Sequence, residues 1–159
     1  MDESNERDRA AVIAPPPLLT VVCAGAGFLA GHFRPLPFLG GNSIFRIILC
    51  SALLLLAVAL TFSGLRQLIT NREHPNPYEP THAIVDSGIY RFTRNPIYVG
   101  FLLLVLAAAA GADNAWLLVS FVALFLVLQF GVVKPEERYL SSKFGEGYDD
   151  YRRRVRRWI

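Results

Sequence analysis

Four long apolar runs separated by polar segments limit what this chain of 159 residues can fold into. The runs cover residues 18–33, 44–68, 96–112 and 116–133. The second is long enough to cross the hydrocarbon core of a bilayer, which takes about 20 helical residues, and the third is short. Hydrophobic residues make up 53% of the chain, and charges gather at both ends and in the centre. The pattern predicts an all-α integral membrane protein with about four transmembrane helices.

The polar segments outside these runs carry predictions of their own. Residues 1–14 begin polar and mildly acidic, and we expect them to be disordered. Asn42 or Ser43 can cap the second membrane helix. Residues 70–81 hold three prolines, which deny helix and favour an extended linker.

Residues 134–159 form a tail in which apolar and aromatic side chains recur every three or four positions. This period predicts an amphipathic helical segment. Pro135 is expected to end or kink the fourth helix, and Gly145 and Gly147 to divide the tail into two pieces. The stripe consists of Leu140, Phe144, Tyr148, Tyr151, Val155 and Trp158.

Small residues and cysteines inside the apolar runs indicate ordinary packing. Gly27 and Gly31 are spaced so that two helix backbones can approach closely, which we interpret as packing within the chain rather than dimerisation. The oligomeric state is left open. Cys23 and Cys50 lie in apolar surroundings, and their spacing predicts neither a disulfide nor a metal site.

Arginines in the polar segments predict an orientation. Residues 66–94 and the tail both carry several, and four membrane crossings would place these two segments on the same side. The positive-inside rule makes that side the cytoplasm, with both termini on it. The small, arginine-rich and lysine-poor chain suggests a bacterial plasma membrane. Nothing in the composition suggests a nucleic-acid partner.

The stretch from His82 to Phe101 is polar and turn-rich, although it borders an apolar run. Asp86, Ser87 and Gly88 are typical of a tight turn, and Asn95-Pro96 of a helix start. Ionisable groups held at a membrane face are energetically costly and usually functional. This stretch is therefore the candidate site.

The stretch resembles the isoprenylcysteine carboxyl methyltransferase family of integral membrane enzymes. The family pattern is matched by His82, Ile84, Val85, Ser87, Gly88, Ile89, Tyr90, Arg94, Asn95, Pro96, Tyr98 and Gly100. A second block, Glu136-Glu137 followed by Leu140, Phe144, Gly145, Tyr148 and Tyr151, resembles the C-terminal segment of the family. Asn95 stands where the prenylcysteine enzymes have His, a form that is closer to the related phospholipid methyltransferases.

The resemblance implies an enzyme that uses S-adenosylmethionine. This cofactor needs an acceptor for its ammonium group, donors for its carboxylate and a surface for its adenine. The sequence lacks the glycine-rich fingerprint of a dinucleotide-binding fold, so a soluble Rossmann-type methyltransferase is not expected. The residues that the resemblance implies around the cofactor are His82, Ile84, Tyr90, Asn95, Pro96, Tyr98 and Glu136.

Methyl transfer mainly requires alignment and the exclusion of water. Arg94 can orient a carboxylate acceptor with two hydrogen bonds, whereas an amine or a thiol would need a base, for which Glu137 and His82 are candidates. A membrane setting implies a lipophilic acceptor, such as a lipid, that enters from the bilayer. The sequence leaves open which of the three groups is methylated.

Taken singly, these residues have simpler explanations. Tyr90 and Tyr98 could be interfacial aromatics, Arg94 a topology-setting arginine, and the two glutamates a solvated helix end. Their joint occurrence in the family's order favours function. His32 and His74 fall on no motif position. Two further hypotheses are an NADPH-dependent membrane reductase of the sterol-reductase type and a non-catalytic membrane scaffold.

Overall fold

The computed structural model describes residues 10–40, 43–76 and 78–159. Regular structure in this part of the chain is helical, apart from one isolated parallel bridge between Thr93 and Arg156. The all-α fold is therefore confirmed. The elements are α2 (Pro16–Phe33), α3 (Ser43–Thr70), η1 (Gly88–Arg91), α4 (Pro96–Ala112), α5 (Trp116–Leu128), η2 (Gln129–Val133), α6 (Lys134–Phe144) and α7 (Glu146–Arg154).

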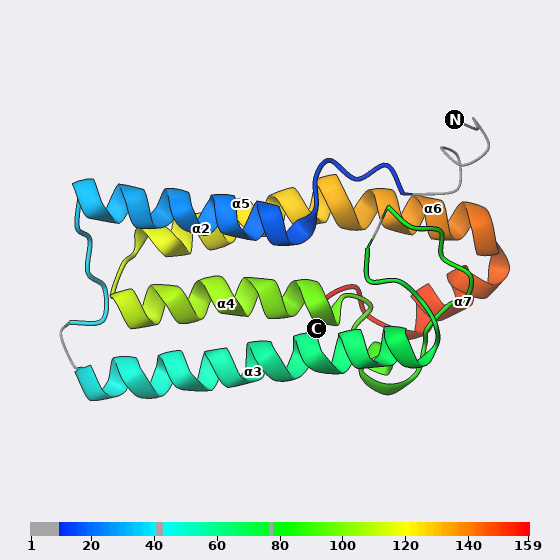
Figure 1. The fold of residues 1–159 in the computed structure, drawn as a ribbon, viewed down its shortest axis with the longest axis horizontal. Coiled ribbons are helices and arrows are strands. Elements are labelled where there is room, and N and C mark those ends of the chain that lie inside the picture. The colour runs from blue at the N-terminus through cyan, green and yellow to red at the C-terminus, as the bar shows by residue number, and fades with distance from the viewer. Residues whose placement is uncertain (1–9, 41–42, 77) are drawn as a thin grey trace.

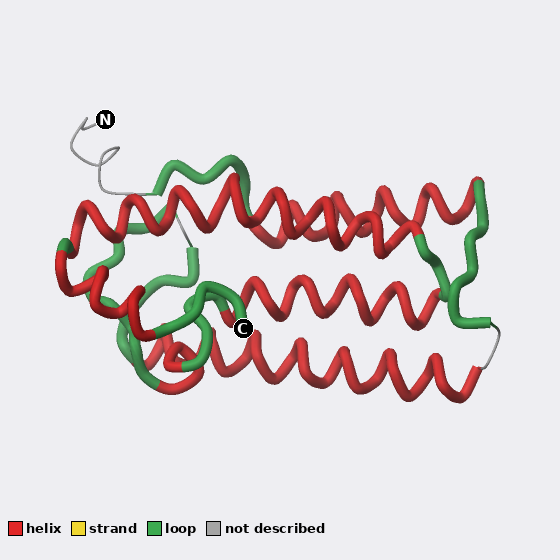
Figure 2. Tube along the Cα trace, turned by 180° about the vertical axis from the view of Figure 1, so that it is seen from behind, coloured by secondary structure: helices red, strands yellow, loops and turns green. Residues whose placement is uncertain are grey.

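Helices α2, α3, α4 and α5 lie along the long axis of the molecule, and each runs opposite to the one before it (Figure 1). Helix α4 packs against α3, α5 and α2. Residues 34–40 and 113–115 lie at one end of the bundle, and residues 78–95, α6 and α7 lie at the other. Figure 2 shows the same separation from behind. The two motif blocks are thereby brought to one end.

Within the described residues, three helical stretches are long and apolar enough to cross a membrane: Pro16–Phe33, Ser43–Thr70 and Trp116–Phe144. The chain is thus a membrane protein, as predicted. Helix α4 has the predicted bounds, but with 17 residues it is shorter than these three. Eight of its residues are buried, because it lies against three other helices. The predicted count of four spans therefore stays a prediction.

Pro135 does not end the fourth helix, which continues from α5 through η2 into α6. A proline lacks the N–H that would bond the carbonyl four residues earlier, here that of Gly131. The helix widens to a π-type turn over Gln129–Val133 just before the proline. The N–H of Ile13 donates to the Gly131 carbonyl at 3.1 Å. The carbonyl that Pro135 leaves without its helical donor thus binds the N-terminal segment.

That segment is packed, so the predicted disorder of residues 1–14 does not hold for residues 10–14. Ala10 and Val12 are buried in the main hydrophobic cluster. The physical reason is local: the acidic, polar character ends before Ala10, and the residues that follow are apolar. Residues 1–9 and the proposed cap Asn42 lie outside the described residues.

Gly27 and Gly31 serve packing within the chain, as predicted. A Cβ atom at Gly27 would lie 2.5 Å from the Ser120 hydroxyl on α5, and one at Gly31 would overlap the Asn114 side chain. The close approach of α2 to this part of the chain therefore requires glycine at both positions.

The tail forms two helical pieces, as predicted, and only one of the two glycines lies between them. Gly145 has φ +53° and separates α6 from α7, whereas Gly147 lies inside α7. Tyr148, Tyr151 and Val155 are buried together, which confirms the predicted amphipathic stripe for these residues. Partly buried residues that pack against them are Ile84, Leu140 and Phe144.

Candidate active site

A pocket lies at the end of the bundle where α3 ends and α4 begins. Its cavity volume is about 160 Å³, and it is partly open to solvent. Its polar and aromatic lining consists of Glu73, His74, Asn76, Thr81, Tyr90, Arg94, Asn95, Tyr98, Glu136, Glu137, Tyr139, Tyr148 and Tyr151.

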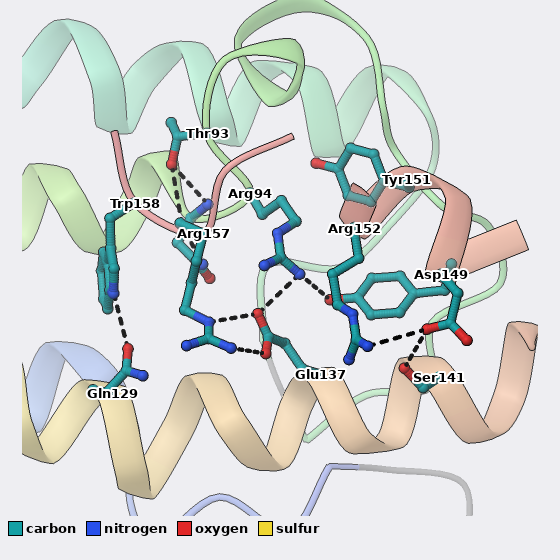
Figure 3. A network of polar contacts seen from close by, with 12 residues as sticks. Thr93, Arg94, Gln129, Glu137, Ser141, Asp149, Tyr151, Arg152, Arg157 and Trp158 are labelled. Carbon is teal, nitrogen blue, oxygen red and sulfur yellow. Dashed lines mark hydrogen bonds and ion pairs between the residues drawn. The ribbon is translucent and has the colours of Figure 1, made fainter. Parts of the chain in front are cut away.

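Glu137 lies at the centre of a network of charges beside this pocket (Figure 3). Arg94 approaches its Oε1 atom at 2.9 Å, and both side chains are more than nine-tenths buried. Arg157 donates from Nε and Nη2 to the two carboxylate oxygens, at 2.8 and 2.7 Å. Charged hydrogen bonds of this bidentate kind are strong and geometrically specific.

The C-terminal segment holds Arg94 in place. The backbone N–H of Arg94 donates to the Arg156 carbonyl at 3.0 Å, next to the bridge between Thr93 and Arg156. The Asn95 amide donates to the Arg157 carbonyl at 2.8 Å. Asn95 is buried and thus joins the start of α4 to the end of the chain. The loop before α4 and the C-terminus form one unit.

Glu136 points to a different partner from its neighbour. Successive residues of a helix point about 100° apart, so two adjacent glutamates face different sides. The hydroxyl of Tyr98 on α4 donates to Oε1 of Glu136 at 2.6 Å. The pair Glu136–Tyr98 and the pair Glu137–Arg94 therefore both join α6 to the start of α4.

Tyr90 and Tyr151 close the side of the pocket next to α7. The Tyr151 hydroxyl donates to the Tyr90 carbonyl at 2.9 Å, and both residues are buried. Burial raises the pKa of both phenols well above the usual value, and it also raises that of Tyr148. These tyrosines are neutral hydrogen-bonding groups at physiological pH.

Glu73 organises the loop that carries the first motif residues. It is buried, and its carboxylate accepts the N–H of His82 and the N–H of Ala83, the latter at 2.7 Å. The His82 ring is 70% exposed and is not among the residues that line the pocket. His74, which matches no motif position, does line it.

The structure brings most of the predicted site residues to this one pocket. Those that line it are Ile84, Tyr90, Arg94, Asn95, Pro96, Tyr98, Glu136 and Glu137; His82 lies nearby with its ring outside. Sequence reasoning missed Glu73 and Arg157 as site residues. Arg157 is one of several arginines near the C-terminus, and nothing in the sequence distinguishes it from the others. Glu73 belongs to no motif, and its partners are backbone groups of a folded loop.

This set of groups fits S-adenosylmethionine. Arg94 offers a cation for a carboxylate, and its Nε atom is buried without a hydrogen-bond partner among the described residues. Glu136 offers a carboxyl group that can accept hydrogen bonds from an ammonium group. Several tyrosines offer surfaces and hydroxyls for a nucleobase. A zwitterionic amino acid joined to an aromatic base needs this combination.

Comparisons with known proteins agree with these features. The model of the phospholipid methyltransferase family matches residues 45–147. The protein-S-isoprenylcysteine O-methyltransferase of Schizosaccharomyces pombe is 38% identical over 76 residues, which are 46% of this chain and 31% of the relative. A probable protein-S-isoprenylcysteine O-methyltransferase of Oryza sativa is 30% identical over 78 residues, or 49% of this chain and 41% of the relative.

An uncharacterized protein of Haemophilus influenzae is 40% identical over 63 residues, which are 40% of this chain and all of that protein. The chain thus spans less than half the length of these relatives with named activities. No solved structure matches the chain significantly.

Proposed function

The chain belongs to the phospholipid methyltransferase family, and from this premise we propose that it transfers a methyl group from S-adenosylmethionine to a lipophilic acceptor at a membrane face. The observation that carries the proposal is that Arg94, Glu136 and Glu137 line the same pocket. Arg94 forms an ion pair with Glu137, and Glu136 accepts a hydrogen bond from Tyr98. The named relatives methylate isoprenylcysteine, by their names, and the family model is one of phospholipid methyltransferases.

Each site residue has a proposed role. Arg94 holds the carboxylate of the cofactor with its guanidinium group, and Glu136 faces the ammonium group of the cofactor. Ile84, Tyr90, Pro96 and Tyr98 surround the remainder of the cofactor, while Asn95 keeps the start of α4 attached to the C-terminus. When bound, S-adenosylmethionine supplies an electrophilic methyl group. The protein has to orient the acceptor and exclude water.

The hydrogen bonds of Glu137 favour one class of acceptor. Both of its oxygens are already bound by guanidinium groups, and His82, the other candidate base, has an exposed side chain and does not line the pocket. An amine or a thiol must lose a proton during methylation, whereas a carboxylate need not. Of the three acceptors, we therefore favour a carboxylate on a lipophilic molecule.

The orientation in the membrane belongs to the same proposal. We place the pocket end of the bundle, with both termini, on the cytoplasmic side of a bacterial plasma membrane, where S-adenosylmethionine is available. The distribution of arginines supports this orientation. In this arrangement residues 1–159 act as a single methyltransferase domain.

Calorimetric titration of the detergent-purified protein with S-adenosylhomocysteine tests the proposal. We expect saturable binding that falls by about tenfold to a hundredfold in Glu137→Gln, because a charged hydrogen bond contributes roughly 1.5–3 kcal/mol. Glu146→Gln is the matched control, since Glu146 is exposed on α7. Absence of binding by the folded wild-type protein would refute the proposal, and binding of NADPH instead would support a reductase.

A further inference from the structure

Arg157 differs from the other arginines near the C-terminus. Arg152 and Arg153 pair with Asp149 and Asp150 on the same exposed helix face, as residues three apart do. Arg154 lies 3.6 Å from Asp86, with both side chains largely exposed. Exposed pairs of this kind contribute little to stability. Arg157, by contrast, reaches a buried carboxylate within the candidate site.

The backbone at Arg157 is fixed independently of its side chain. Its carbonyl accepts the Asn95 amide at 2.8 Å. The next residue, Trp158, donates from its indole to Gln129 at 2.8 Å and packs on the Phe125 ring with centroids 5.2 Å apart. Removal of the guanidinium group should therefore leave the C-terminal segment in place.

The charges around Glu137 do not cancel when Arg157 is present. Glu137 and Arg94 alone would form a neutral buried pair. The bidentate contact of Arg157 adds a second cation on the far side of the carboxylate, which leaves the three groups with a net charge of +1 (Figure 3). Arg94 lines the pocket, and Arg157 is not among the lining residues. The surplus positive charge is thus presented to the pocket through Arg94.

We propose that Arg157 is a positioning residue that holds both oxygens of Glu137 and so keeps Arg94 available for an anionic group of the ligand. The inference rests on the proposed function. Glu136, adjacent to Glu137, also lines the pocket, so a guanidinium group and a hydrogen-bond-accepting carboxyl group flank the same space. This pairing identifies the anionic group as the carboxylate of the cofactor's zwitterionic amino-acid end. In Figure 3, Arg94 and Arg157 approach Glu137 from different sides.

The test compares two ligands in calorimetric titrations of the full-length protein. S-adenosylhomocysteine carries the amino-acid end, and 5′-methylthioadenosine has the same nucleoside without it. We expect Arg157→Gln to weaken binding of the first by roughly tenfold or more, as loss of a charged hydrogen bond does, and to leave the second unchanged. Arg157→Lys should restore part of the affinity, since it keeps the charge without the bidentate geometry.

Arg153→Gln is the matched control, because it removes an arginine of the same tail from an exposed pair. It should bind both ligands like the wild type. Equal affinity of Arg157→Gln and wild type for S-adenosylhomocysteine would overturn the inference. Equal weakening of both ligands would also overturn it, because a loss of the fold would affect them alike. Failure of the wild type to bind S-adenosylhomocysteine would instead remove the proposed function, and this inference with it.

Discussion

Burial and chemical type together decide whether a side chain at the pocket is neutral or charged. Tyr90, Tyr148 and Tyr151 have raised pKa values, chiefly because burial disfavours the phenolate. Glu137 and Arg94, in contrast, are buried as a charged pair, which is stable only if both partners are present. The same pocket therefore combines neutral and charged groups.

The tyrosines predict how stability depends on pH. A phenol whose pKa is raised on folding stabilises the folded state fully below its unfolded value of 10.0, and this stabilisation is lost as pH rises towards the folded value. We expect the free energy of unfolding to fall above pH 10.0, by about 1.4 kcal/mol per pH unit for each such tyrosine.

Tyrosinate absorbance recorded together with thermal unfolding in detergent checks this prediction. Tyr151→Phe should reduce the slope of stability against alkaline pH, because one of the buried phenols is then missing. It also removes a hydrogen bond to the Tyr90 carbonyl, so its stability at neutral pH should be lower. A wild-type titration in which all tyrosines ionise near their ordinary value, with the fold intact, would contradict the prediction.

Among the elements, the long helix from Trp116 to Phe144 connects the apolar bundle to the site. It passes through the π-type turn η2, enters α6 at Pro135 and then presents Glu136 and Glu137. The N-terminal segment binds at this turn through the bond from Ile13 to Gly131. Packing of residues 10–14 should therefore stabilise the part of the helix that carries the glutamates.

Two glycines on different helices make a matched test of this contact. A Cβ atom at Gly131 would overlap the Ile13 side chain, whereas nothing lies within 4 Å of one at Gly25 on α2. We expect Gly131→Ala to displace the Ile13 side chain and to be less stable than Gly25→Ala by about 1 kcal/mol, a modest cost because Ile13 is 64% exposed and can move. Gly25→Ala should be neutral or stabilising by up to about 1 kcal/mol, because alanine favours helix.

Thermal unfolding in detergent and hydrogen exchange of residues 10–14 measure the two effects. We expect faster hydrogen exchange at these residues in Gly131→Ala and the wild-type exchange rate in Gly25→Ala. Equal stability of the two variants would show that the contact between Ile13 and Gly131 does not contribute.

The two ends of the helix bundle differ: one holds the pocket, and at the other the connections between helices bind one another. Opposite the pocket, the Asp113 carboxylate accepts the N–H groups of Phe38 and Leu39, each at 2.8 Å, and lies 3.7 Å from Arg46. The indole of Trp116 donates to the Arg34 carbonyl at 2.8 Å. These contacts join the two connections at that end and hold the four helices in register.

Asp113→Ala should therefore separate folding from binding. Two backbone N–H groups lose their acceptor and Arg46 loses an ion-pair partner, so the free energy of unfolding should fall by about 1–3 kcal/mol. The pocket lies at the other end of the bundle, and the affinity for S-adenosylhomocysteine should stay at the wild-type value. Thermal unfolding and calorimetry on the same preparation check both expectations, and a marked loss of affinity would show that the two ends are coupled.

The sequence by itself determined the helices and the membrane class, because these depend on local apolar content. The bounds predicted for α4 agree with the structure, and those of α2 and α3 agree within two residues. The ordered motif also led to the family and to most of the residues around the pocket. The prediction of disorder was wrong for residues 10–14, which are apolar and include Ala10 and Val12 of the main hydrophobic cluster, and the helix does not end at Pro135.

Only the tertiary structure decided which charges meet. The bidentate contact of Arg157 with Glu137 joins residues 20 positions apart, and within the sequence Arg157 resembles its neighbours. Glu73 is distinguished by the backbone groups that it binds, which the chain presents only when the loop is folded. Electrostatic partners depend on position in space, whereas helix formation depends on neighbours in sequence.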